Sequence, residues 1–125
     1  MEKAFFSAVL DALVSNIAVV DEEGTITHVN ESWVRFAREN GDPRLLSTGV
    51  GINYLSVCHM AMRDDPSLAD MVQSIEDVIS ARIPHYSCED PCHSPDKKRW
   101  FLLGARHLNA GPGGAVFFHL DITEK

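Results

Sequence analysis

The stretch IAVVDEEGTITHV, residues 17–29, most constrains how this chain can fold. It opens on four apolar residues, continues into Glu22-Glu23-Gly24, and ends on a segment rich in β-branched residues. Two short strand-forming segments around a glycine-containing turn predict an antiparallel hairpin. Asn30 follows at once, and its side chain can accept a free backbone N–H of the segment ESWVRFAREN. We therefore expect the hairpin to lead directly into a helix.

The rest of the chain alternates between helical and strand patterns. Residues 2–14 carry apolar side chains at helical spacing, which predicts an amphipathic helix. Further helices are expected at about 53–62 and 67–82, the second with Ser67 as N-cap and Asp70 three residues later. The last third predicts three strands, the final two separated by the turn NAGPGG. This order predicts an α+β fold: a five-stranded antiparallel sheet with helices packed on one face and an N-terminal amphipathic helix.

Composition narrows the functional classes. The 125 residues are enough for one domain, which we divide into the helix at 1–15 and the main domain at 16–125. A net charge of −7 argues against a nucleic-acid binder, which needs a basic face. No apolar stretch approaches the roughly 20 residues that cross a bilayer. The odd number of cysteines, 3, fits a reducing compartment, so we expect a cytoplasmic protein.

Three stretches together resemble a PAS domain of bacterial sensor histidine kinases and diguanylate cyclases. They are IAVVDEEGTITHVNESW, PCHSPDKKRWF, and the Asp-Ile-Thr before Glu124-Lys125. The resemblance, which covers about Leu10 to Lys125, implies a non-catalytic sensory or dimerisation module in signal transduction. It implies that a small molecule or cofactor can sit between the sheet and the middle helices. It also implies a signal output position at Asp121 and Thr123, leading to a C-terminal output domain.

The resemblance further implies that the N-terminal helix packs against a second protomer, so we expect a homodimer. The apolar residues expected at that interface are Phe5, Phe6, Val9, Leu10 and Leu13. We expect a ligand pocket to be lined from the sheet face and the middle helices, although the same side chains would also line a filled core. These pocket residues are Val19, Trp33, Phe36, Tyr54, Leu55, Ile75 and Trp100.

The residues argue against flavin adduct chemistry and give only weak support for haem. The flavin photoreceptors among PAS domains carry Gly-x-Asn-Cys, whereas this chain has GINYL, with Tyr54 in place of the reactive cysteine. A phenol cannot form the thiol adduct, and Cys58 lies one helical turn further on. His59 is the one plausible haem ligand, and a lone histidine is a weak signal. His28 and His119 are interpreted as surface or core-edge residues.

The stretch HYSCEDPCH, residues 85–93, raises the question of a zinc site. Neighbouring side chains on a strand point to opposite faces, so its two histidines and two cysteines do not converge. We therefore do not expect zinc through Cys88 and Cys92. Cys88, on the same face as Tyr86, is interpreted as a small core residue of a hairpin.

The chain contains no Walker loop, no Gly-x-Gly-x-x-Gly and no pattern of a Ser-His-Asp triad, so we do not expect an enzyme. Two functions remain. The first is a module that senses a small ligand or relays a signal to an output domain, and the second is a ligand-free protein–protein interaction module. The sequence leaves the ligand, the type of output domain and the direction of signalling open.

Overall fold

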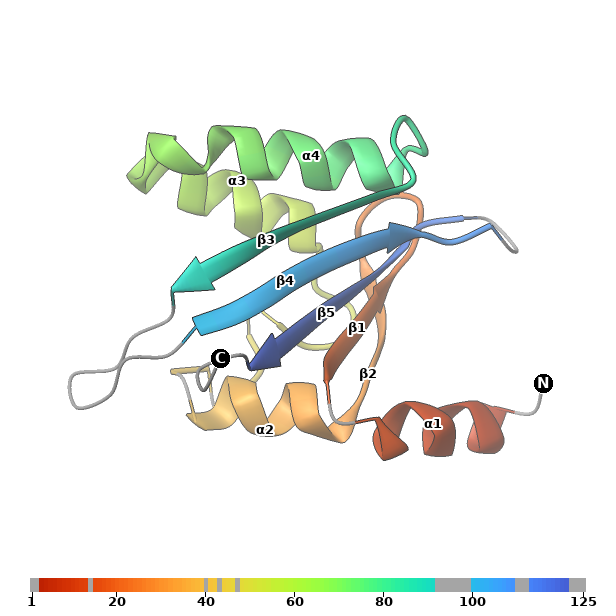
Figure 1. Cartoon of the computed structure of the whole chain (residues 1–125). Helices are drawn as coiled ribbons and strands as arrows, with labels where there is room; N and C mark the ends of the chain where they lie inside the picture. The colour runs from red at the N-terminus through yellow and green to blue at the C-terminus, as the bar shows by residue number, and fades with distance from the viewer. Residues whose placement is uncertain are drawn as a thin grey trace.

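Five antiparallel strands form one sheet in the order β2-β1-β5-β4-β3 (Figure 1). The structure is a computed structural model that describes residues 3–13, 15–39, 41–42, 44–46, 48–91, 100–109 and 113–121. The strands are β1 (Asn16–Val20), β2 (Ile26–Val29), β3 (His85–Pro91), β4 (Trp100–His107) and β5 (Ala115–Asp121). The first and last strands in sequence are neighbours at the centre of the sheet, where Ala18 pairs with Phe117.

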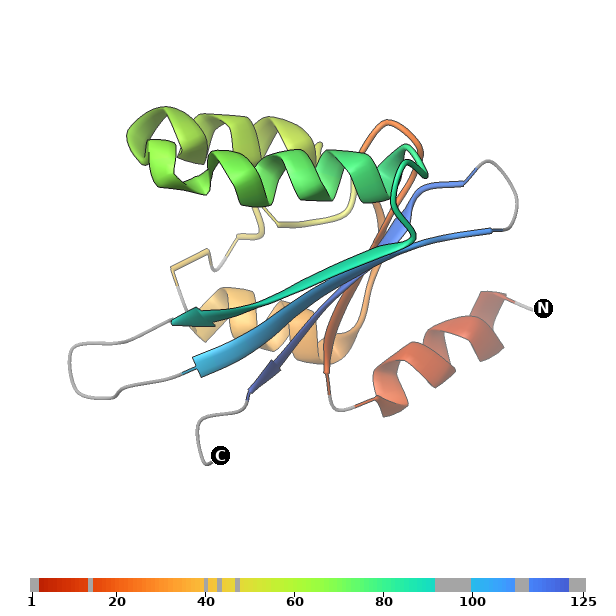
Figure 2. The ribbon, with the colours of Figure 1, turned by 45° about the horizontal axis from the view of Figure 1, so that its top comes forward.

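Helices connect and flank the sheet (Figure 2). They are α1 (Lys3–Ala12), α2 (Glu31–Glu39), α3 (Tyr54–Asp64) and α4 (Ala69–Ile79), with a single 3-10 turn, η1 (Pro66–Leu68), before α4. α3 and α4 run side by side, and α2 lies along another part of the sheet (Figures 1 and 2). The predicted α+β fold with a five-stranded antiparallel sheet is confirmed.

Alternation along β5 separates a helix-facing side of the sheet from an outer side. Phe117 and Ala115 belong to the buried core with Val72, Ile75 and Val78 of α4. Residues 116, 118 and 120 therefore face the other way.

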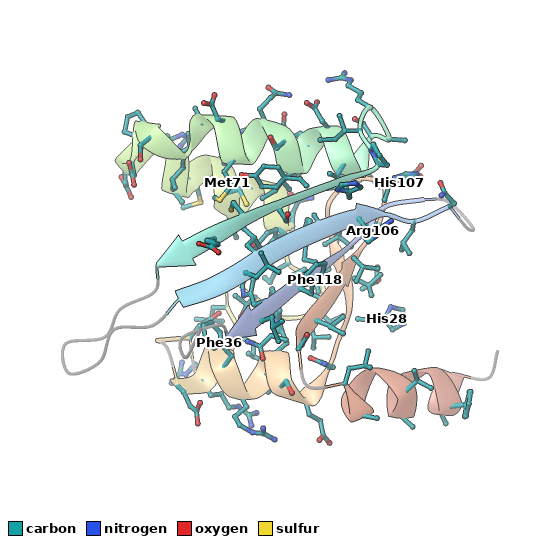
Figure 3. The ribbon with its side chains drawn as sticks, in the orientation of Figure 1. His28, Phe36, Met71, Arg106, His107 and Phe118 are labelled. Carbon is teal, nitrogen blue, oxygen red and sulfur yellow. The ribbon has the colours of Figure 1, made fainter. Side chains whose placement is uncertain are left out.

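The outer side has one close approach, between Gly104 of β4 and Phe118 of β5, which are register partners. A Cβ at position 104 would lie 1.9 Å from Cζ of Phe118, so the Phe118 ring lies over the glycine. Figure 3 labels Phe118 on the sheet. Only glycine leaves room for the ring in this position.

The first hairpin forms as predicted, and the side chain of Asp21 together with a glycine at position 24 fixes its turn. Oδ1 of Asp21 accepts from the backbone N–H groups of Glu23 and Thr25, at 2.9 and 3.0 Å. Gly24 has φ +88°, and a Cβ there would lie 2.8 Å from Cγ of Leu55. Both the dihedral and the contact require glycine at this turn.

Asn30 caps α2, as the sequence predicts, and it is fully buried. Its Oδ1 accepts from the backbone N–H of Ile17 at 2.9 Å and of Trp33 at 3.0 Å. Its Nδ2 donates to the carbonyl oxygen of Ser15 at 2.8 Å. One amide therefore joins the start of α2 to β1 and to the segment that enters β1.

The predicted N-cap of the helix at 67–82 is wrong. Ser67 lies inside η1, where Oδ1 of Asp65 accepts from the backbone N–H of Ser67 at 3.1 Å. α4 begins only at Ala69, and the preceding Leu68 makes no side-chain cap. Asp65 precedes Pro66, which favours the start of a helical turn at that point and moves the cap two residues upstream of the prediction.

α1 lies beyond the β1 and β2 side of the sheet (Figure 1). Oδ1 of Asp11 accepts from the backbone N–H of Glu31 at 2.9 Å, which joins the end of α1 to the first turn of α2. Phe5, Val9 and Leu13 are 60%, 40% and 46% exposed. The side chains of Phe6 and Leu10 lie outside the described part. Within the described residues, no helix combines the length and the apolar character needed to cross a membrane.

Candidate functional site

A small cavity of about 130 Å³ lies between α2, the segment that follows it, the start of α3, and β5. Among the described residues, seven side chains from these four elements line it. They are Trp33, Phe36, Ala37, Asp42, Thr48, Tyr54 and His119.

Aromatic rings make up most of the cavity wall. The His119 imidazole and the Trp33 indole are stacked, with centroids 5.5 Å apart and 29° between their planes. Phe36 meets His119 at 71° with centroids 6.0 Å apart, and Tyr54 meets Trp33 at 64° and 6.3 Å. Figure 3 shows Phe36 on α2. Two rings therefore lie nearly parallel while two others stand steeply against them, and edge-to-face contacts of this kind are favourable.

His119 is partly buried among these rings, and burial lowers the pKa of its imidazole to about 4. Desolvation disfavours the charged form of histidine, which explains the direction of the shift. At neutral pH His119 therefore presents a neutral ring to the cavity.

The polar wall of the cavity is formed by the segment after α2. The Trp33 indole Nε1–H donates to the backbone carbonyl of Thr48 at 2.9 Å. The Thr48 hydroxyl donates to Oδ2 of Asp42 at 2.7 Å, and the backbone N–H of Leu46 donates to Oδ1 at 2.9 Å. These bonds fix the Asp42 carboxylate and hold the segment against α2.

The structure brings together three of the seven predicted pocket residues, namely Trp33, Phe36 and Tyr54. Ile75 is a buried core residue, and Leu55 packs against that core beside the first hairpin. Trp100 begins β4, and its side chain lies outside the described part.

The placement of Val19 in the pocket needs correction. Ala18 and Val20 flank it in β1, and they pair with Phe117 and Ala115 on the helix-facing side. Because strand residues alternate, Val19 points to the outer side, away from the cavity. An apolar strand gives no sequence signal for which of its two sets of residues faces the helices.

Four lining residues were missed as pocket residues: Ala37, Asp42, Thr48 and His119. His119 was interpreted as a surface or core-edge residue, yet it follows Phe117 by two positions and so shares its face. Its position two residues after Phe117, a large apolar residue of the same strand, was the sequence signal that could have placed His119 on the helix-facing side. Asp42 and Thr48 lie in an irregular segment, where periodicity carries no information.

β5 connects the cavity to both ends of the described domain. His119 is the register partner of Asn16, the first residue of β1, which follows the segment from α1. Asp121, a predicted output residue, ends β5 two positions after His119 and pairs with Phe101. Its side chain and Thr123 as a whole lie outside the described residues.

The other cofactor candidates lie elsewhere. His59 Nε2 is 2.5 Å from Oε1 of Glu76, so this ring joins α3 to α4. Cys58 is buried, and burial together with the nearby Glu76 raises the pKa of its thiol to about 11. Such a thiol is a poor nucleophile at neutral pH.

The structure describes only part of the stretch HYSCEDPCH, residues 85–93, that raised the question of a zinc site. Cys88 is partly buried in β3, whereas Cys92 and His93 lie outside the described part. The described ranges contain no group of three or more His, Cys, Asp or Glu side chains arranged to hold a metal ion.

Comparison with known proteins gives one sequence relative and many structural ones. No family model matches the chain. An uncharacterized 104.1 kDa protein of Rhodobacter capsulatus, in the hypE 3′ region, is 42% identical over 118 residues. This match covers 93% of the chain but only 12% of the relative.

Solved structures with similar folds come from several bacteria. The PAS domain of a Colwellia psychrerythraea protein has a TM-score of 0.58 at 19% identity, covering 98% of both chains. The PAS domain of Bordetella pertussis BvgS has a TM-score of 0.61 at 15% identity, covering 98% of this chain and 87% of that one. The photoactive yellow protein domain of the sensor histidine kinase Ppr from Rhodospirillum centenum has a TM-score of 0.61 at 14% identity, covering 91% of each.

Proposed function

We propose that this chain, which has the PAS fold, is a non-catalytic sensory module of a bacterial signalling protein. In this proposal a small ligand enters the aromatic cavity and biases the arrangement of β5. One observation carries the proposal: His119 lines the cavity, pairs with Asn16 at the start of β1, and lies two residues before Asp121. A change at one ring therefore reaches the strand ends that lead to α1 and out of the domain.

The relatives support a modular role. Domains of this fold are described in sensor histidine kinases, and the similar segment in the Rhodobacter capsulatus protein makes up 12% of a 104.1 kDa chain. A module of this kind acts through the domains to which it is joined. We propose a C-terminal output domain as its partner.

The proposed mechanism is a shift between two populated arrangements of the domain. A ligand changes such an equilibrium only by binding one arrangement more tightly. Here the difference would arise where His119 stacks on Trp33 and meets Phe36, because a ligand in the cavity contacts these same rings. The ends of β1 and β5 would carry the change outward.

An exchangeable ligand suits the site better than haem through His59 or zinc through Cys88 and Cys92. His59 Nε2 faces Glu76 on α4, and the lining of the cavity does not include His59. A haem would also require far more space than about 130 Å³.

A second proposed role is dimerisation through α1. Phe5 and Val9 are exposed apolar side chains four residues apart on α1, and the exposed Leu13 directly follows the helix. All three would be covered in a contact between two such helices. This role is also compatible with the ligand-free interaction module, which would dimerise or dock an output domain without sensing a molecule.

A binding screen that compares wild type with a variant whose cavity is filled distinguishes the two functions. Small molecules would be screened by thermal shift and ligand-observed NMR against wild type, Ala37→Leu and Ala61→Leu. Ala37 is buried in the cavity wall, whereas Ala61 is exposed on α3. We expect binders that stabilise wild type and Ala61→Leu but not Ala37→Leu.

Cooperative thermal unfolding of Ala37→Leu would establish that its fold is intact. A screen that finds no binder for wild type would contradict sensing and favour the interaction module. Binders that act equally on all three proteins would contradict the cavity as the site.

A further inference from the structure

The size of the cavity restricts what it can hold. Its volume is about 130 Å³, close to the roughly 150 Å³ of an engineered cavity that binds benzene. Pockets for drug-sized molecules are about 300–1,000 Å³. The ligand therefore has on the order of five to seven non-hydrogen atoms, or inserts a group of that size.

The aromatic lining of the cavity favours one kind of charge. Phe36 stands at 71° to His119, and Tyr54 at 64° to Trp33, so rings approach the cavity from several directions. The face of an aromatic ring carries partial negative charge and attracts cations. Trp33, the best cation-binding ring type, is at the centre of this arrangement.

The polar part of the cavity wall also favours a cation. The carboxylate of Asp42 lines the cavity, and the Thr48 hydroxyl and the Leu46 N–H are among the donors that hold its oxygens in place. His119 contributes no opposing positive charge at neutral pH, since burial lowers its pKa to about 4. The net charge of −7 also favours the approach of a cation over that of an anion.

We infer that this cavity binds a small organic cation of the methylated ammonium class, held against the rings of Trp33, Phe36 and Tyr54 beside the Asp42 carboxylate. This inference rests on the proposed function and names the chemistry of its ligand. A methylated ammonium suits the site because it has apolar methyl groups for the rings and a charge for the carboxylate. It also needs few hydrogen bonds, and this suits a wall formed largely by aromatic rings.

The test compares two probes of the same shape that differ in charge, choline and 3,3-dimethyl-1-butanol. Each would be titrated into the ¹⁵N-labelled protein, and the Trp33 indole N–H would serve as reporter because it donates to Thr48 in the cavity wall. We expect choline to shift this signal and to bind at least tenfold more tightly than its neutral counterpart.

Two variants with the same change in charge locate the carboxylate that matters. Asp42→Asn removes the charge in the wall, and Asp64→Asn removes one at the exposed end of α3. Choline should bind Asp42→Asn at least fivefold more weakly, while Asp64→Asn should match wild type within twofold. Phe36→Leu, which leaves every charge in place, should also weaken choline binding severalfold.

The outcomes separate this inference from the proposed function. Equal binding of choline and 3,3-dimethyl-1-butanol would overturn the cation assignment while leaving a ligand cavity in place. The cation assignment would also be overturned, and the ligand cavity retained, if choline did not bind at 10 mM while other molecules bound wild type but not Ala37→Leu. Loss of choline binding in both Asp variants alike would show a general charge effect and overturn the assignment to Asp42.

Discussion

The imidazole of His119 stacks on the indole of Trp33, with centroids 5.5 Å apart and planes 29° apart. The two residues come from β5 and α2, so this contact joins the last strand to the first helix of the main domain. His119 therefore lines the cavity and also helps to hold β5 against α2, so changes at this residue should affect both ligand binding and stability.

Protonation of His119 should destabilise the protein. Its folded pKa is about 4, whereas an unfolded histidine has a pKa of about 6.5. As pH falls below 6.5 the unfolded chain binds a proton that the folded chain does not, so stability falls until the pH passes about 4. Between pH 7 and pH 5 we expect a loss of about 2 kcal/mol from this group.

Urea denaturation of wild type and His119→Leu at both pH values checks this prediction. Other titrating groups contribute to both proteins, so the difference between their pH dependences isolates His119. Parallel pH dependences would show that the folded state accommodates the imidazolium.

Replacing Asn30 should be far more costly than replacing a more exposed cap. The Asn30 side chain is fully buried and bonds to the backbone of Ile17, Trp33 and Ser15. Asn30→Ala leaves these backbone groups unpaired, for an expected loss of about 2–4 kcal/mol. Asn53→Ala, at the partly exposed cap of α3, should cost about 1 kcal/mol. Equal unfolding free energies in chemical denaturation would refute this ranking.

Adding a methyl group at Gly104 should disturb the outer side of the sheet. The Phe118 ring occupies the space of the missing Cβ, so Gly104→Ala should destabilise by about 1–3 kcal/mol. In a Phe118→Ala background the same substitution should cost little, because the obstructing ring is gone. A double-mutant cycle measured by urea denaturation gives the coupling, and additive effects would be inconsistent with this contact.

An acidic residue on α1 should prevent the proposed dimer. Phe5→Glu and Val9→Glu each place a charge in the apolar set of α1, and light scattering after size exclusion should then give the monomer mass. Met60→Glu is a matched control, since Met60 is 63% exposed on α3 and Phe5 is 60% exposed on α1. A dimer mass for the α1 variants, or a monomer mass for wild type, would rule out this interface.

The sequence predicted the parts of the fold that depend on local patterns. The first hairpin, the Asn30 cap and the five strands follow from alternation, turn residues and caps that act over a few positions. The predicted cap at Ser67 is wrong because a 3-10 turn, η1, precedes α4 and is capped by Asp65, an equally good capping residue two positions upstream. Local preference alone does not choose between them.

The candidate site was predicted only where size and aromatic character were sufficient. Trp33, Phe36 and Tyr54 were predicted as lining residues, and they line the described cavity. Large aromatic rings on one face of a helix, or at its start, have to pack against a neighbouring element. Val19 was misplaced because an apolar strand shows no alternation. Asp42 and Thr48 depend on the path of an irregular segment, which is set by long-range bonds such as that from the Trp33 indole to Thr48.

The central claim is that occupation of the cavity is felt at the ends of β1 and β5. The most direct measurement is an amide NMR titration with the tightest binder from the Ala37→Leu screen. We predict saturable shifts at His119, Asn16 and Asp121 in wild type, none of them in Ala37→Leu, and little change at Gln73 on the exposed side of α4. Shifts confined to the cavity wall, with Asn16 and Asp121 unchanged, would contradict the claim.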